Sequence, residues 1–165
     1  MKLFLAILSG IIIGGATGLG IFYHHELTNF RVAAWKYPPV VVDCTFGALD
    51  EERIHDAIKY WDDLNHKVGF VEINPSTDVC MKDQIHGFII IKNAELKWPT
   101  IGRTHREGSR IGTIDSALIL LSLGDANLPK LLEHELGHAF GYKHLDVDGH
   151  IMNSNYDYSG WDFWD

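Results

Sequence analysis

Four histidines lie close together in the segment LLEHELGHAFGYKHLDVDGHIMN, which runs from Leu131 to Asn153. On a helix, residues four positions apart lie on the same face, so His134 and His138 can bind one ion together. Gly141 follows where a helix would end, and glycine accepts the left-handed backbone that turns a chain sharply. That turn can bring His144 back toward the first two histidines. Three neutral imidazoles with an open fourth position are typical of a catalytic zinc site.

Glu135 directly follows the first of these histidines and should face the same cavity. A carboxylate there can take a proton from zinc-bound water, whose pKa the metal lowers to about 7, and pass it to a leaving amine. The pattern therefore predicts amide hydrolysis. The competing interpretation is a solvated helix end rich in histidine, which would leave Glu135, Gly141 and Met152 to chance.

The string H-E-x-x-H-x-x-G-x-x-H, with a methionine eight positions after its last histidine, resembles the metzincin zinc endopeptidases, most of all the matrixin branch. The resemblance implies one catalytic Zn²⁺ and a protein or peptide substrate, which would pair with the rim near Thr100 to Arg110. It implies an α/β (α+β) domain, a mixed twisted sheet backed by two helices with an irregular C-terminal part. The residues concerned are the metal ligands His134, His138 and His144, the catalytic Glu135, the turn residue Gly141 and the methionine floor Met152.

Two features depart from the family pattern. Cys44 lies at a predicted strand and not in a leader, so the inhibitory cysteine of matrixin prosegments is not expected here. Position 154 is a serine where some metzincins have a tyrosine, and Tyr156 is not expected to replace it.

Apolar periodicity predicts the elements that position this motif. Asp50 can cap a first helix that runs to about His66, and Pro129 suits the first turn of a second helix ending near Tyr142. The segment from Thr100, rich in glycine and arginine, is expected to form an exposed edge strand or hairpin. The predicted strands are Val40 to Cys44, Gly69 to Ile73, His86 to Lys92 and Ala117 to Ser122.

The chain begins with an apolar segment, Leu3 to Tyr23, that contains no charged residue. About 20 helical residues cross a bilayer core, so residues 1–23 are expected to form an N-terminal transmembrane anchor, followed by a tether at 24–37 and the catalytic domain at 38–165. Lys2 predicts a cytoplasmic N-terminus and a catalytic domain outside the cytoplasm. A cleaved signal peptide is the alternative and would make the protein secreted.

Glycine spacing within the anchor bears on self-association. Gly10, Gly14 and Gly18 recur every fourth residue, a spacing that lets helices approach closely in lipid, although small residues without a partner explain it equally well.

The charge of the chain bears on its partners, and its cysteine content bears on whether it contains a disulfide. All 22 acidic residues but only 13 of the 14 basic ones follow Tyr23, which leaves that part with a charge of 13 minus 22, or −9. An acidic body argues against nucleic acid as a partner. Cys44 and Cys80 are compatible either with one disulfide or with two buried free thiols.

The sequence thus predicts a membrane-tethered zinc endopeptidase. One rival is a retired protease that keeps the fold and the zinc to bind a protein partner. Another is a structural membrane protein whose function resides in the anchor.

Overall fold

The computed structural model describes residues 30–155. The predicted anchor, the first six residues of the predicted tether and residues 156–165 lie outside the described residues. Within 30–155, no helix has both the length and the apolar character needed to span a membrane.

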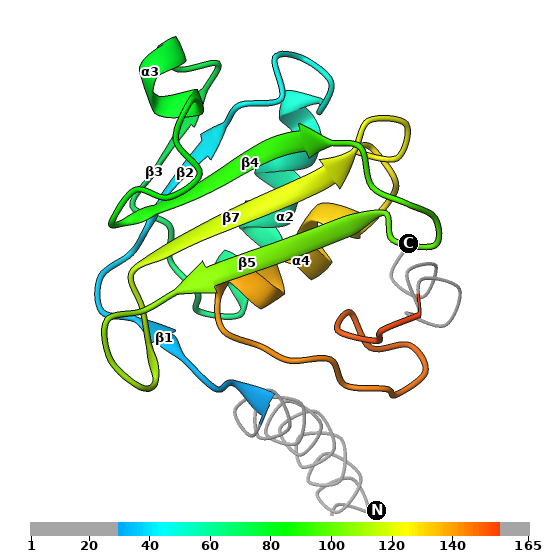
Figure 1. Cartoon of the computed structure of the whole chain (residues 1–165). Coiled ribbons are helices and arrows are strands. Elements are labelled where there is room, and N and C mark those ends of the chain that lie inside the picture. The colour runs from blue at the N-terminus through cyan, green and yellow to red at the C-terminus, as the bar shows by residue number, and fades with distance from the viewer. Residues whose placement is uncertain (1–29, 156–165) are drawn as a thin grey trace, which may run out of the picture.

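A five-stranded mixed sheet forms the centre of the domain, in the order β3-β2-β4-β7-β5. Four strands run parallel, and β5 runs antiparallel to β7 at one edge (Figure 1). This confirms the predicted mixed sheet and the edge strand after Thr100. The strands are β2 (Val40–Asp43), β3 (Phe70–Ile73), β4 (Phe88–Ala94), β5 (Gly102–Glu107) and β7 (Ser116–Ser122).

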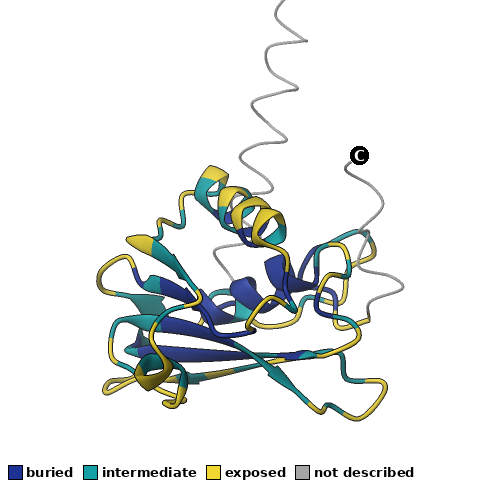
Figure 2. Ribbon diagram, turned by 90° about the horizontal axis from the view of Figure 1, so that it is seen from above, coloured by how far each residue is buried: buried dark blue, intermediate teal, exposed yellow. Residues whose placement is uncertain are grey.

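Two helices, α2 (Glu51–Asp63) and α4 (Leu131–Ala139), pack together on one face of this sheet (Figure 1). Helix α2 buries only a stripe of side chains that includes Trp61, whereas nearly all of α4 is buried, as the dark blue inner helix in Figure 2 shows. The indole of Trp61 donates a hydrogen bond to the carbonyl of Glu133, 2.6 Å away, and Arg53 pairs with the buried Glu133 carboxylate at 2.9 Å. These contacts fix α4, the helix that carries the motif, against α2.

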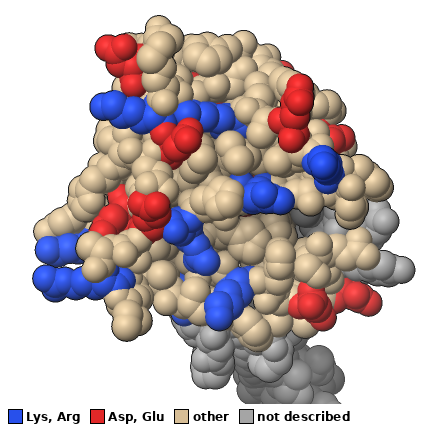
Figure 3. Space-filling view, in the orientation of Figure 1, with Lys and Arg blue, Asp and Glu red and all other residues tan. Residues whose placement is uncertain are grey.

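The opposite face of the sheet is covered less completely, by a smaller apolar cluster around Val42, Ile90 and Leu118 and by the short helix α3 (Thr77–Cys80). A disulfide between Cys44 and Cys80 ties α3 to the end of β2 and decides the alternative that the sequence left open. Over the described residues visible in Figure 3, basic and acidic side chains are intermixed on this face.

The described part of the predicted tether is integrated into the domain. Strand β1 (Ala34–Trp35) pairs in parallel with β6 (Thr113–Ile114), and the indole of Trp35 donates to the carbonyl of Ala139 at 2.9 Å. The guanidinium of Arg31 donates to the carbonyl of Phe140 at the same distance. Within the stretch predicted to be a tether, Arg31 and Trp35 therefore support the end of α4.

Candidate metal centre

Helix α4 carries the first two histidines of the motif one turn apart, as predicted. Their Nε2 atoms lie 3.1 Å from one another, and the Nε2 of His138 lies 3.0 Å from that of His144. The potential ligand atoms of all three are within 4.8 Å of one another. His134 is buried, His138 is partly buried and His144 is exposed, so the cluster opens toward solvent on one side.

Gly141 makes the return of His144 possible. Its φ of +105° lies in the region that favours glycine, and a Cβ atom at this position would overlap the carbonyl oxygen of Ala33. The amide of Gly141 donates to the carbonyl of His138 at 2.9 Å, which closes the last turn of α4. Both the backbone conformation and the close approach of residue 33 therefore require glycine here.

Backbone carbonyls set the orientation of two of the imidazoles. The Nδ1 of His134 lies 2.6 Å from the carbonyl oxygen of Ile151, and the Nδ1 of His138 lies 2.9 Å from that of Tyr142. A carbonyl oxygen can only accept, so each Nδ1 carries the hydrogen and each Nε2 directs its lone pair toward the other histidines. Such carbonyl contacts commonly orient metal-binding histidines.

The low pKa values of His134 and His138 favour the binding of a metal cation over the binding of protons. Burial lowers the pKa of His134 to about 3 and that of His138 to about 4, and neighbouring histidines add to the effect, mainly His138 for His134 and His144 for His138. Neutral imidazoles whose lone pairs meet at about 3 Å repel one another unless a cation lies between them. This donor set therefore fits a metal ion, and nitrogen ligands of this kind suit zinc and other first-row transition metals.

Glu135, which follows His134 on α4, is buried, with 4% of its surface exposed. The hydroxyl of Thr104 on β5 donates to its carboxylate at 2.5 Å, and Gly102 packs so closely that a Cβ there would overlap the same carboxylate. Burial raises the pKa of Glu135 to about 7, and the Thr104 hydrogen bond opposes this rise only in part. A carboxylate with this pKa can both accept and return a proton near neutral pH.

Met152 lies beneath α4 and is 1% exposed. A Cβ on Gly137 would overlap its sulfur and the ring of Trp61, so the helix approaches the methionine closely at this point. The backbone carbonyl of Met152 accepts from the amide of Leu145 at 2.9 Å, which joins the methionine turn to the chain that follows the last histidine.

The sequence alone did not indicate that Thr104, Gly102 and Gly137 belong to this site. Thr104 and Gly102 belong to the predicted edge segment, but nothing in that segment indicates that they face Glu135. Gly137 lies inside the motif at one of its variable positions, and only the packing of α4 on Met152 explains it.

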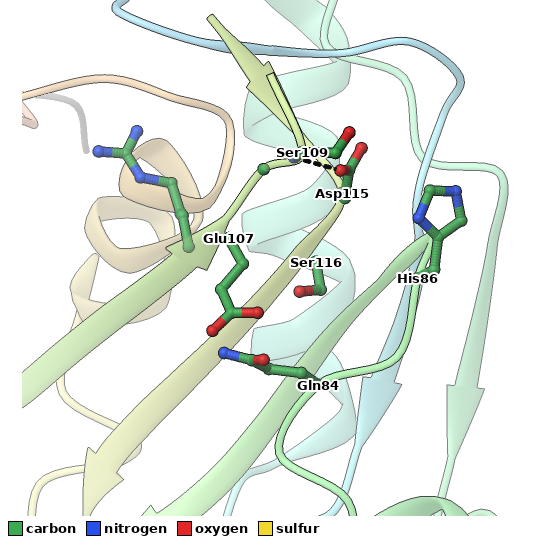
Figure 4. A pocket seen from close by; sticks show the side chains of 8 residues that line it. Gln84, His86, Glu107, Ser109, Asp115 and Ser116 are labelled. Atoms are coloured by element: carbon green, nitrogen blue, oxygen red, sulfur yellow. Dashed lines mark hydrogen bonds between the residues drawn. The ribbon is translucent and has the colours of Figure 1, made fainter. Parts of the chain in front are cut away.

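A separate hollow of about 680 Å³ lies where β5 ends and β7 begins (Figure 4). None of the three histidines lines it. Both acidic and basic side chains line it. Asp115 accepts a hydrogen bond from the backbone amide of Ser109. The side chains labelled in Figure 4 are Gln84, His86, Glu107, Ser109, Asp115 and Ser116.

The chain was also compared with known proteins. It matches no protein-family model and no curated protein.

Proposed function

We propose that this protein is a zinc-dependent endopeptidase of the metzincin type, with a matrixin-like catalytic domain. One observation carries the proposal: three imidazole nitrogens lie within 4.8 Å of one another, and α4, the helix that carries two of these imidazoles, also carries the buried carboxylate of Glu135. His134, His138 and His144 would hold the ion. When bound, zinc supplies a Lewis acid that lowers the pKa of water and polarises the scissile carbonyl.

Glu135 is the proton-transfer group in this proposal. Its buried carboxylate would accept a proton from the attacking water and deliver one to the leaving nitrogen. Thr104 and Gly102 hold its carboxylate in one position, because the hydroxyl contacts one oxygen and the glycine lets the strand pass close to the other. A fixed base loses little orientational freedom when the reaction occurs.

Strand β5 supports a polypeptide as the substrate. It pairs with β7 on one side only and stands at the edge of the sheet, so its outer N–H and C=O groups can pair with an added strand. The same strand carries the residue that contacts Glu135. A substrate bound along β5 would therefore pass beside the proton-transfer group.

Two features support a proposed location outside the cytoplasm at a membrane. The disulfide between Cys44 and Cys80 is the kind of bond that persists in oxidising compartments, which supports a catalytic domain outside the cytoplasm. Residues 1–23 are proposed to anchor this domain in the membrane as a single-pass helix, with self-association through the glycines of the anchor.

Two measurements on the full-length protein in detergent test the proposal. We expect one zinc ion per chain by metal analysis, and cleavage of unfolded protein substrates that stops on addition of a chelator and returns with zinc. A His144→Ala variant should lose both. Zinc at one per chain without cleavage of any substrate in a broad peptide library would refute the endopeptidase proposal and favour a retired, partner-binding domain.

A further inference from the structure

Arg106 lies on β5 two residues beyond Thr104. Side chains two residues apart point to the same face of a strand, so Arg106 faces α4 as Thr104 does. Helix α4 packs against β5, and Thr104 on this face of the strand contacts the Glu135 carboxylate. Arg106 therefore lies on the side of β5 that faces the proposed proton-transfer group.

No carboxylate neutralises this guanidinium among residues 30–155. Arg106 takes part in none of the ion pairs of this region, and its Nη1 atom is buried without a hydrogen-bond partner. Glu107 is next to it in sequence and faces the opposite side of the strand. By contrast, the partly buried Arg53 pairs with Glu133 at 2.9 Å.

A guanidinium with a buried nitrogen and no ion-pair partner favours the binding of a carboxylate ligand. A buried charge without a partner is unfavourable, and burial indeed lowers the pKa of Arg106. A guanidinium binds a carboxylate through two parallel hydrogen bonds, which are stronger than hydrogen bonds between neutral groups. An anionic group arriving beside β5 would supply the missing partner.

The segment around Arg106 is basic in an otherwise acidic protein. Residues 102–112 contain Arg103, Arg106 and Arg110 but only one acidic residue, Glu107, whereas the whole chain has a net charge of −8. On the face of β5 that carries Gly102 and Thr104, Arg106 is the only charged residue of the strand, so an acidic group that approaches this face meets a positive charge. Charge and geometry thus point to the same class of ligand.

We propose that Arg106 is a specificity-determining residue that binds an Asp or Glu side chain of the substrate close to the scissile bond, so that the preferred substrates are acidic stretches of polypeptide. The inference rests on the proposed endopeptidase function. Two strand residues span about 7 Å, so an acidic side chain facing Arg106 belongs to a residue within about two positions of the bond next to Glu135.

The first test is a cleavage-site profile of the zinc-loaded full-length protein on a peptide library. We expect enrichment of Asp and Glu at one position within two residues of the cut. Arg106→Gln should lower kcat/KM for acidic peptides by roughly 10- to 100-fold, the range expected for the loss of a charge-assisted hydrogen bond. Arg106→Glu should shift the enrichment to Lys and Arg, which a merely structural role of Arg106 would not produce.

Arg103→Gln is the matched control, since Arg103 lies on the same strand, is exposed and faces the opposite side of the sheet. Its cleavage profile should match that of the unmodified protein. Absence of acidic enrichment in the unmodified protein, or an equal effect of the Arg103 and Arg106 substitutions, would overturn the inference and leave the endopeptidase proposal intact.

A binding measurement separates the two proposals. Zinc-loaded Glu135→Gln protein should bind a fluorescent acidic peptide without cleaving it, and adding Arg106→Gln should weaken binding roughly 10- to 100-fold, as followed by anisotropy. If the unmodified protein cleaves nothing, Arg106-dependent binding of this peptide still supports the inference. Equal binding of acidic and neutral peptides rejects it.

Discussion

Replacing Glu135 with glutamine should separate the chemistry of the site from its architecture. Glutamine has nearly the same shape, and its amide oxygen can accept the hydrogen bond from Thr104. The three histidines are untouched, so we expect zinc at one per chain. Peptide hydrolysis should fall by at least about 10²- to 10⁴-fold, the usual contribution of a general base.

The same substitution should change the stability of the metal-free protein in a pH-dependent way. Burial raises the pKa of Glu135 from 4.5 to about 7, so the folded state favours the protonated carboxyl. The stability that this group contributes is complete below about pH 4.5 and is lost as the pH rises through 7. The two pKa values correspond to a loss of about 3 kcal/mol at pH 8, which glutamine avoids because it has no charge.

The expected result is therefore a glutamine variant that equals the unmodified protein near pH 4.5 and is more stable by about 3 kcal/mol at pH 8. Urea unfolding of the full-length, metal-free chain in detergent measures this difference. His134 and His138 have lowered pKa values, so their contribution is lost as the pH falls below 6.5, but it is the same in both proteins and cancels. Full peptidase activity in the variant, or lower stability at pH 8, would refute the role assigned to Glu135.

Three further variants test the packing around the site and the stability of the domain. Gly102→Ala should place a methyl group on the Glu135 carboxylate and lower kcat/KM by about tenfold or more without loss of zinc, as judged by kinetics with metal analysis; unchanged kcat/KM would mean that the carboxylate does not lie against β5. Gly137→Ala should destabilise the protein by about 1 to 3 kcal/mol in urea unfolding, because the new methyl overlaps buried atoms; a more stable variant would contradict that packing. Replacing Cys44 and Cys80 together with serine opens a loop with a sequence separation of 36 and should cost about 4 kcal/mol, so an unchanged unfolding midpoint would exclude a stabilising role for the disulfide.

Much of the fold was predictable because its main elements have local signals. The apolar run from Phe88 to Ile91 predicted β4, and the spacing of Ile54, Ala57 and Trp61 predicted α2. The short elements β1, β6 and α3 contain two to four residues and are too short to show a periodicity. They form because the rest of the domain offers them partners.

The boundaries of α4 show the limit of local signals. Pro129 suggested the first turn, but the helix begins at Leu131 because Lys130 has a left-handed conformation, with a φ of 63°. Lysine carries no sequence signal for that conformation. At the other end, the glycine at position 141 did indicate the turn, since its backbone freedom is a property of the residue alone.

The amino-acid sequence was sufficient to place His134 and His138 on one helical face and to indicate a turn at Gly141, because helix geometry and glycine conformation are local. Only the tertiary structure decided which strand lies against that helix. The register of β5 brings Thr104 to Glu135 and places Arg106 on the same face of the strand, with one guanidinium nitrogen buried and without a partner. It depends on the pairing of β5 with β7 and on the packing of the whole core, which no pattern within β5 encodes.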